Sequence, residues 1–215
     1  MVDTKQLIQN LSAEAKPVKL IRPQRYALLL LALLSIYAVC AQCWMVGFRF
    51  DLSTQLARPL FMVELLLLVA MLVSASVASV YAMLPDGAQR KTLMRSPYIF
   101  SSGMLALVMV QLFLPQDARM VMANATSHTH ECTMYIAFSS ILPAILTFGL
   151  LRNGASVMPM QAGLLAVIAA VSVSAITLRL AEANDEIMHL LTWHYLPSLF
   201  FASLGAVLGR YLLRW

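Results

Sequence analysis

Six long apolar runs constrain the fold of this 215-residue chain more than any other feature of its sequence. Read with a window of about 20 residues, the length that crosses a bilayer core, they lie at 26–46, 59–83, 98–115, 133–151, 161–180 and 190–212. Each run must be helical, because hydrocarbon offers backbone groups no hydrogen-bond partners. The third is the shortest and is bounded by Pro97 and Pro115. The sequence therefore predicts an all-α integral membrane protein whose six transmembrane helices form three hairpins.

The charge content agrees with this fold class. Only 12% of the residues are charged, about half the share of a soluble domain. The net charge of +5 is better explained by basic cytoplasmic loops than by nucleic acid, so the expected surroundings are the lipid bilayer, with no direct nucleic-acid partner. The first 25 residues are polar and show no cleavable signal peptide, which divides the chain into a tail (1–25) and a six-helix membrane domain (26–215).

The distribution of basic residues predicts the orientation, because cytoplasmic loops carry the excess of Lys and Arg. Eleven basic residues would share one side of the membrane: Lys5, Lys16, Lys19, Arg22, Arg25, Arg90, Lys91, Arg95, Arg152, Arg210 and Arg214. The four on the other side are Arg49, Arg58, Arg119 and Arg179. Both termini are therefore predicted to be cytoplasmic, and the loops near 47–58, 116–132 and 181–189 to face outwards.

Metal-ligand side chains gather at that outer face. The stretch NATSHTHECTMY contains His128, His130, Glu131 and Cys132, and the last outer loop contributes Glu182, Asp185, Glu186 and His189, with His194 entering the sixth helix. Imidazole, carboxylate and thiolate together suit zinc, copper or cadmium. A helix N-terminus would also favour the reactive thiolate of Cys132. The alternative is a polar loop with incidental histidines and a packed cysteine.

The spacing of the last two histidines does not follow the usual metal-binding pattern. His194 follows His189 by five residues, whereas a spacing of four aligns two ligands on one face of an α-helix. All four histidines nevertheless lie at the outer ends of the fourth and sixth helices. That shared position favours metal or redox sensing, with Cys132, His128, His130, Glu131, Glu182, His189 and His194 as the candidate ligands.

Three other reactive side chains lie within the apolar runs. Cys40 and Cys43 form a C-x-x-C near the outer end of the first helix, where two cysteines often serve only for packing. Glu64 lies about one turn inside the second helix, where a carboxyl group is costly to bury and is a functional candidate. It could pair with Arg49 or Arg58, join the histidines and Cys132, or stay protonated.

The cytoplasmic tail has its own pattern. Asp3 or Thr4 can cap a helix over residues 5–15, and Pro17 ends it. Leu7, Ile8, Leu11 and Ala15 would share one face at helical spacing. A single amphipathic helix of this length is marginal alone in water. It either lies on the inner leaflet, held by the adjacent basic residues, or docks into a groove of a soluble partner.

The order and spacing of several short motifs resemble those of the negative regulator of sigma F (NrsF) family of bacterial inner-membrane anti-sigma factors. These motifs are LIQNLSAEAKPVKLIRP, RPLFMVELLLL, HEC, LP at 142–143, TWH at 192–194 and the terminal LGAVLGRYLLRW. The resemblance covers nearly the whole chain and implies a regulator rather than an enzyme. The absence of a phosphate-binding glycine loop, a hydrolase serine motif and paired catalytic carboxylates agrees with that.

The resemblance implies that the tail holds an extracytoplasmic-function sigma factor at the membrane until a heavy metal or an oxidant acts on periplasmic cysteines. Cys132 takes the place of the first family cysteine, but Glu182 stands where the second is usual. This departure puts a two-cysteine disulfide switch in doubt, and favours a mixed site of Cys132, Glu182 and histidines or a sensor for another signal.

The combined hypothesis assigns the sigma-factor contact to Leu7, Ile8 and Leu11, flanked by Lys16, Lys19 and Arg22. Metal binding or oxidation would pull the outer ends of the fourth and sixth helices together and lower the affinity of the tail. The alternative function is a small membrane transporter or redox protein that uses Glu64, Cys40, Cys43 and Cys132. A structural membrane subunit is a third, plainer interpretation.

Overall fold

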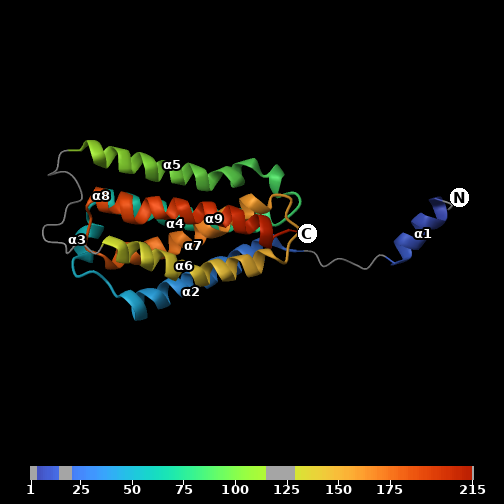
Figure 1. The fold of residues 1–215 in the computed structure, drawn as a ribbon, viewed down its shortest axis with the longest axis horizontal. Helices are drawn as coiled ribbons and strands as arrows, with labels where there is room; N and C mark the ends of the chain where they lie inside the picture. The colour runs from blue at the N-terminus through green and yellow to red at the C-terminus, as the bar shows by residue number, and fades with distance from the viewer. Residues whose placement is uncertain (1–3, 15–20, 115–128, 215) are drawn as a thin grey trace.

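The fold was analysed in a computed structural model that describes residues 4–14, 21–114 and 129–214 (Figure 1). In this part of the chain every regular element is a helix. In chain order they are α1 (Thr4–Glu14), α2 (Pro23–Ala41), the π-helical turn η1 (Gln42–Val46), α3 (Leu52–Leu56), α4 (Pro59–Ala82), the 3₁₀ turn η2 (Gly87–Gln89), α5 (Lys91–Phe113), α6 (Thr129–Leu151), α7 (Pro159–Ala181), α8 (Ile187–Leu190), the π-helical turn η4 (Leu191–Tyr195) and α9 (Leu196–Leu212).

Six helical stretches of the described chain are long and apolar enough to cross a bilayer, which confirms the predicted number. Their bounds are Pro23–Val46, Pro59–Ala82, Lys91–Phe113, His130–Leu151, Pro159–Ala181 and Ile187–Leu212. The first combines α2 with η1, and the last combines α8, η4 and α9. Five of the six begin within three residues of the predicted start.

The third span begins seven residues before its predicted start, and Pro97 lies inside α5 instead of preceding it. A proline within a helix has no N–H for the carbonyl four residues earlier, which here is that of Leu93. The Ser96 hydroxyl donates to this carbonyl at 2.9 Å. A local hydrogen bond thus replaces the missing one, and the helix continues through the proline. Pro115, the other predicted boundary, lies outside the described residues.

Two further prolines within spans also free a carbonyl, and in both cases a hydroxyl from a neighbouring helix donates to it. The carbonyl four residues before Pro143 belongs to Ser139 and accepts the Tyr37 hydroxyl of α2 at 2.6 Å. The carbonyl four residues before Pro197 belongs to Trp193 and accepts the Thr133 hydroxyl of α6 at 2.8 Å. Each proline frees one acceptor in the apolar interior, and a side chain from another helix satisfies it.

The helix α7 lies at the centre of the bundle and packs against α4, α6 and α9. Figure 1 shows α5 along one edge and α2 along the opposite edge. Gly163 of α7 faces Gly205 and Gly209 of α9, so that a Cβ at Gly163 would collide with the α9 backbone. Small residues of this kind let two membrane helices approach closely.

The start of α2 and the C-terminal end of α9 lie at one end of the bundle, whereas α3 and α8 lie at the other (Figure 1). This arrangement suits termini on a common side, although that this side is cytoplasmic stays a prediction. The helix α1 lies apart from the bundle in Figure 1, and its bounds differ by one residue at each end from the predicted 5–15. The side chains of Leu7 and Leu11 and all of Lys16 and Lys19 are outside the described residues.

Candidate functional site

Four potential metal ligands converge at the end of the bundle that holds α3 and α8. Cys132 comes from the first turn of α6, Glu182 directly follows α7, His189 lies in α8 and His194 in η4. One ligand atom from each residue lies within 4.8 Å of the others. We call these four residues the Cys–Glu–His cluster. Cys132 and both histidines are buried, and the Glu182 side chain is 14% exposed.

The carboxylate of Glu182 is the centre of the cluster. Its Oε1 accepts the Cys132 thiol at 3.1 Å and lies 2.9 Å from His189 Nε2, while its Oε2 lies 2.9 Å from His194 Nε2. Both histidine contacts have ion-pair distances, but Glu182 Oε2, His189 Nε2, His194 Nε2 and His194 Nδ1 have no hydrogen-bond partner in the described structure. Buried polar atoms without a hydrogen-bond partner require an explanation, and a cation bound by Glu182, His189 and His194 would satisfy them.

The electrostatic surroundings keep Glu182 ionised. Burial alone would raise its pKa, but the contact with His194, the Cys132 thiol and the nearby His189 together outweigh burial and place the pKa below its ordinary value. Cys132 was expected to be a reactive thiolate. Instead its sulfur is buried and donates to the Glu182 carboxylate, so the structure contains a protected thiol beside an anion.

Only part of the predicted ligand set comes together. Glu131 and His130 are exposed on α6, because consecutive helical residues are separated by 100° and cannot all face the cluster that Cys132 joins. His128 lies outside the described residues. Glu182, predicted as a ligand from its position before the TWH motif, lies between the thiol and the two imidazoles.

The five-residue spacing of His189 and His194 is accommodated by η4. A π-helical turn closes hydrogen bonds between residues five apart rather than four, so it returns His194 to the side that His189 occupies. Their ring centroids are 5.4 Å apart with an edge-on arrangement. The sequence pattern alone does not distinguish a π turn from an α turn, and the histidine spacing was its only available signal.

A second set of buried charges lies beside the cluster. Arg179 of α7 forms a two-point ion pair with Glu64 of α4, with Nε to Oε1 at 2.8 Å and Nη2 to Oε2 at 3.0 Å. Its Nη1 lies 3.0 Å from Asp185. Asp185 in turn pairs with Arg49 at 2.7 Å, and Arg49 Nε pairs with Asp51 at 2.6 Å. We call these five residues the arginine network.

Glu64 was expected to pair with Arg49 or Arg58, to join the histidines and Cys132, or to stay protonated, and the structure pairs it with Arg179 instead. Arg179 had been counted only as a basic residue of the outer side, but it is buried within the bundle. The Phe61 ring lies between the two arginines, 5.0 Å from the Arg179 Cζ and 5.6 Å from the Arg49 Cζ. Pairing with carboxylates and the aromatic ring compensates the cost of burying both guanidinium groups.

Asp51 and Arg49 lie at the edge of the network, outside the spans. The hydrogen bond from Arg49 is the main cause that lowers the pKa of Asp51 from its usual 3.8 to about 2. For Arg49, burial opposes the charge, but hydrogen bonds to Asp185 and Asp51 raise its pKa overall. Both groups therefore stay ionised over the whole physiological pH range.

The cluster and the network meet at two adjacent residues of η4. His194 contacts Glu182 of the cluster, and the hydroxyl of the next residue, Tyr195, donates a hydrogen bond to Glu64 Oε1 of the network. The short connection after α7 provides a second junction, since it carries both Glu182 and Asp185. Sequence reasoning identified neither junction.

The remaining cysteines lie in the first span, and neither forms a disulfide. Cys40 in α2 is half-buried, and Cys43 in η1 is exposed. Neither belongs to the Cys–Glu–His cluster.

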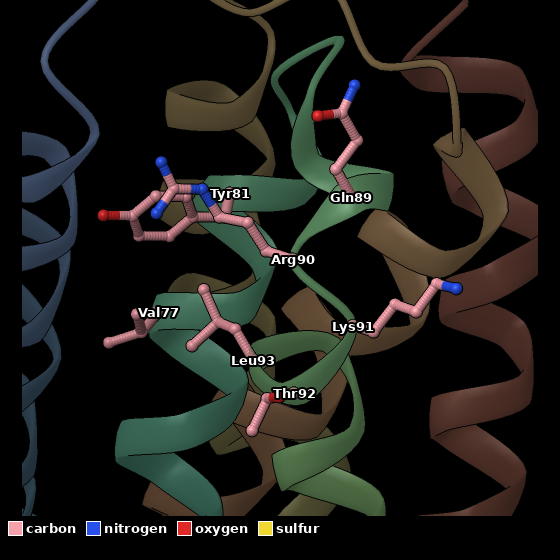
Figure 2. A pocket seen from close by; sticks show the side chains of 7 residues that line it. All are labelled: Val77, Tyr81, Gln89, Arg90, Lys91, Thr92 and Leu93. Atoms are coloured by element: carbon pink, nitrogen blue, oxygen red, sulfur yellow. The ribbon is translucent and has the colours of Figure 1, made fainter.

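The opposite end of the bundle is basic. A cavity of about 540 Å³ is lined there by Val77, Tyr81 and residues 89–93 (Figure 2). Figure 2 shows the Arg90 side chain extended across the Tyr81 ring, with its Cζ 4.6 Å from the ring centroid. Arg90 and Lys91 were both assigned to the cytoplasmic side. Arg90 and Lys91 thus lie at this end, whereas the Cys–Glu–His cluster and the arginine network lie at the other.

A family model described as negative regulator of sigma F matches residues 11–215. No curated protein matches the chain, and no solved structure matches it.

Proposed function

The chain belongs to the negative regulator of sigma F family, and from this we propose that it is an anti-sigma factor of the bacterial inner membrane that holds an extracytoplasmic-function sigma factor through its cytoplasmic tail. Six candidate spans support a multi-pass membrane protein, and the family description supports a sigma-factor partner. The released sigma factor would then be free to bind RNA polymerase.

The tail is suited to this role by its separation from the bundle. The helix α1 lies apart from the six spans (Figure 1), and Ile8 on its apolar face is 60% exposed. An apolar stripe of this kind is stabilised when it enters a groove of a partner. We assign the contact to Leu7, Ile8 and Leu11, and the flanking charge to Lys16, Lys19 and Arg22.

The signal that we propose is a transition-metal ion bound by the Cys–Glu–His cluster. One thiolate, two imidazoles and one carboxylate form the donor set of a four-coordinate zinc site, and cadmium or copper can use the same set. The convergence of these four donors within 4.8 Å, with both histidine Nε2 atoms buried and without hydrogen-bond partners, carries this proposal. An oxidant has less support, because the cluster holds a single thiol.

The transporter or redox alternative is less well supported. Glu64 would be its main ionisable group, but that carboxylate is bound by Arg179 and Tyr195. A cavity of about 500 Å³ between α4, α5, α7 and α9 is lined mainly by apolar side chains. Its serines include Ser101 and Ser172, whose hydroxyls donate to carbonyls of their own helices. Such a cavity does not favour passage of an ion.

The test is co-expression of the protein with the sigma factor encoded beside it, followed by purification from detergent-solubilised membranes. The full-length protein should retain the sigma factor, and a variant that lacks residues 1–22 should not, although both reach the membrane. Failure of both proteins to retain it would refute the anti-sigma assignment and return the transporter alternative to first place.

A further inference from the structure

We propose that Tyr195 couples the Cys–Glu–His cluster to the arginine network and so passes the state of the cluster to α4. The inference rests on the proposed metal-sensing function and adds the route by which the signal leaves its site. In this role Tyr195 is a positioning residue, because its hydroxyl contacts Glu64 and none of the four candidate ligands.

The geometry of η4 links the two sites. His194 and Tyr195 are neighbours in one π-helical turn, but their side chains reach different partners, Glu182 and Glu64. π-helical turns inside longer helices are frequent at functional sites. The Thr133 hydroxyl holds the Trp193 carbonyl at 2.8 Å, so α6, which carries Cys132, is tied to the same turn. A displacement of His194 therefore displaces Tyr195.

The distances between donor atoms in the present cluster differ from those of a tetrahedral zinc site. Glu182 oxygens lie only 2.9 Å from each histidine Nε2. Four donors in a tetrahedron of zinc-type bonds, about 2.0–2.3 Å long, are about 3.3–3.7 Å apart. Some donors of the present cluster lie closer together than this and others lie up to 4.8 Å apart, so the side chains have to rearrange to serve as ligands. The histidine side chains, and η4 with them, are therefore expected to shift when the ion binds.

Glu64, the residue that the Tyr195 hydroxyl contacts, is itself held in place by other side chains. Glu64 is fixed by two bonds from Arg179, and Arg179 and Arg49 are both held by Asp185. Asp185 lies three residues after Glu182, so the connection between α7 and α8 joins the same two sites by a second path. With both paths anchored, movement of η4 must either break the Tyr195 hydroxyl bond or shift α4.

The helix α4 then offers a route to the opposite end. It runs from Pro59 to Ala82 and ends at the Tyr81 and Arg90 cavity (Figure 2). A ligand shifts a two-state equilibrium only by its preference for one state. The Tyr195–Glu64 hydrogen bond supplies such a difference if it is present in one state of the bundle and absent in the other.

The test uses the full-length protein in complex with its sigma factor, with Zn²⁺ as the probe, and the variant Tyr195→Phe. The variant should bind Zn²⁺ within threefold of the wild-type affinity and retain the sigma factor without Zn²⁺, but the Zn²⁺ concentration for release should rise at least tenfold. Tyr37→Phe is the matched control. It also removes a part-buried tyrosine hydrogen bond, to the Ser139 carbonyl, and should release the sigma factor like the wild type.

If Tyr195→Phe releases the sigma factor at the wild-type Zn²⁺ concentration, Tyr195 does not couple the two sites. If the variant no longer binds Zn²⁺, Tyr195 supports the structure of the cluster instead, and the coupling is also refuted. Amide hydrogen exchange of the wild-type protein, measured with and without Zn²⁺, tests the coupling without any variant. Zn²⁺ should change the exchange of α4 near Glu64, and unchanged exchange there would contradict the proposal. If the wild-type complex binds Zn²⁺ without releasing the sigma factor, or does not bind it, the proposed sensing of Zn²⁺ is wrong, whereas the anti-sigma role is tested separately by co-purification.

Discussion

His189 and His194 present their imidazoles to the same carboxylate although they are five positions apart in the chain. Their Nε2 atoms lie 2.9 Å from the two oxygens of Glu182. The π-helical turn between them provides the extra residue that this spacing needs. Because the turn aligns the two rings, each should contribute directly to metal affinity.

We expect His189→Gln and His194→Gln each to weaken Zn²⁺ binding by more than the 10–100-fold that loss of an outer-shell partner costs. A competition titration with a chromophoric chelator in detergent measures this. His130→Gln is the control, since His130 is exposed and outside the cluster, and its affinity should be unchanged. Binding should also release protons and weaken towards acid pH, because Cys132 must lose its proton and the imidazoles must be neutral. Equal affinities for all three variants would exclude the site.

The ion pair of Glu64 and Arg179 should be essential for stability. Glu64→Ala removes the two-point partner of the buried Arg179 and leaves it only Asp185, which Arg49 also holds; breaking such a buried pair costs about 3–5 kcal/mol. Chemical unfolding in mixed micelles measures this change in the free energy of unfolding. The comparison protein is Arg58→Ala at an exposed position, which should change stability by less than about 0.5 kcal/mol. A Glu64→Ala variant whose free energy of unfolding is close to that of the wild type would show that the network does not stabilise the protein.

Asp51 should make the protein sensitive to acid. Its pKa is about 2 in the folded protein against an ordinary 3.8, so the folded state favours the ionised form. That stabilisation is complete above about pH 5 and is lost as the pH falls from about 4 to about 2. Its size is roughly 1–2 kcal/mol, since one pKa unit corresponds to about 1.4 kcal/mol and solvent screens part of the effect.

The measurement compares the unfolding of wild-type protein with that of Asp51→Asn between pH 6 and pH 2. Wild type should be the more stable of the two at pH 6, and the difference should vanish near pH 2. A difference that is constant over this range would mean that Arg49 does not hold the Asp51 carboxylate.

The proposed docking helix makes a separate prediction. Leu11→Glu adds a charge to its apolar face and should abolish repression of sigma-dependent transcription without affecting membrane insertion. Asn10→Asp adds a charge to the exposed opposite face and should leave repression intact. A reporter gene together with membrane fractionation reads both effects. Repression that survives Leu11→Glu would mean that the tail binds through other residues.

The Trp193 carbonyl, which Pro197 leaves without a backbone partner, should lower the stability of the protein if its hydrogen bond is removed. Thr133→Val removes the hydroxyl that satisfies the Trp193 carbonyl, and an unpaired buried acceptor costs about 1–3 kcal/mol. Thr133→Ser keeps the hydroxyl and should lose far less stability. Thermal unfolding of the two variants in detergent gives the comparison, and equal melting temperatures would mean that the hydrogen bond contributes nothing.

The sequence predicted the number of spans because bilayer thickness fixes the length of an apolar run. It also indicated Cys132, Glu182, His189 and His194, since their side-chain chemistry is distinctive and they lie at outer helix ends. It did not predict the partner of Glu64, because that pairing depends on how α4 packs against α7. The start of α5 was missed because a hydrogen bond from Ser96 allows Pro97 inside the helix. The π turn was missed because residue spacing alone does not reveal helix type.

The distance along the chain between Glu64 and Arg179 has a consequence for biogenesis. The two residues are 115 positions apart, and at about 5–20 residues per second a ribosome needs roughly 6–23 s to reach the arginine after the glutamate. During this interval α4 has left the ribosome without its final counter-charge. The second span therefore cannot reach its mature environment until the fifth has been made, and a chain truncated before Arg179 should be recognised by membrane quality-control proteases.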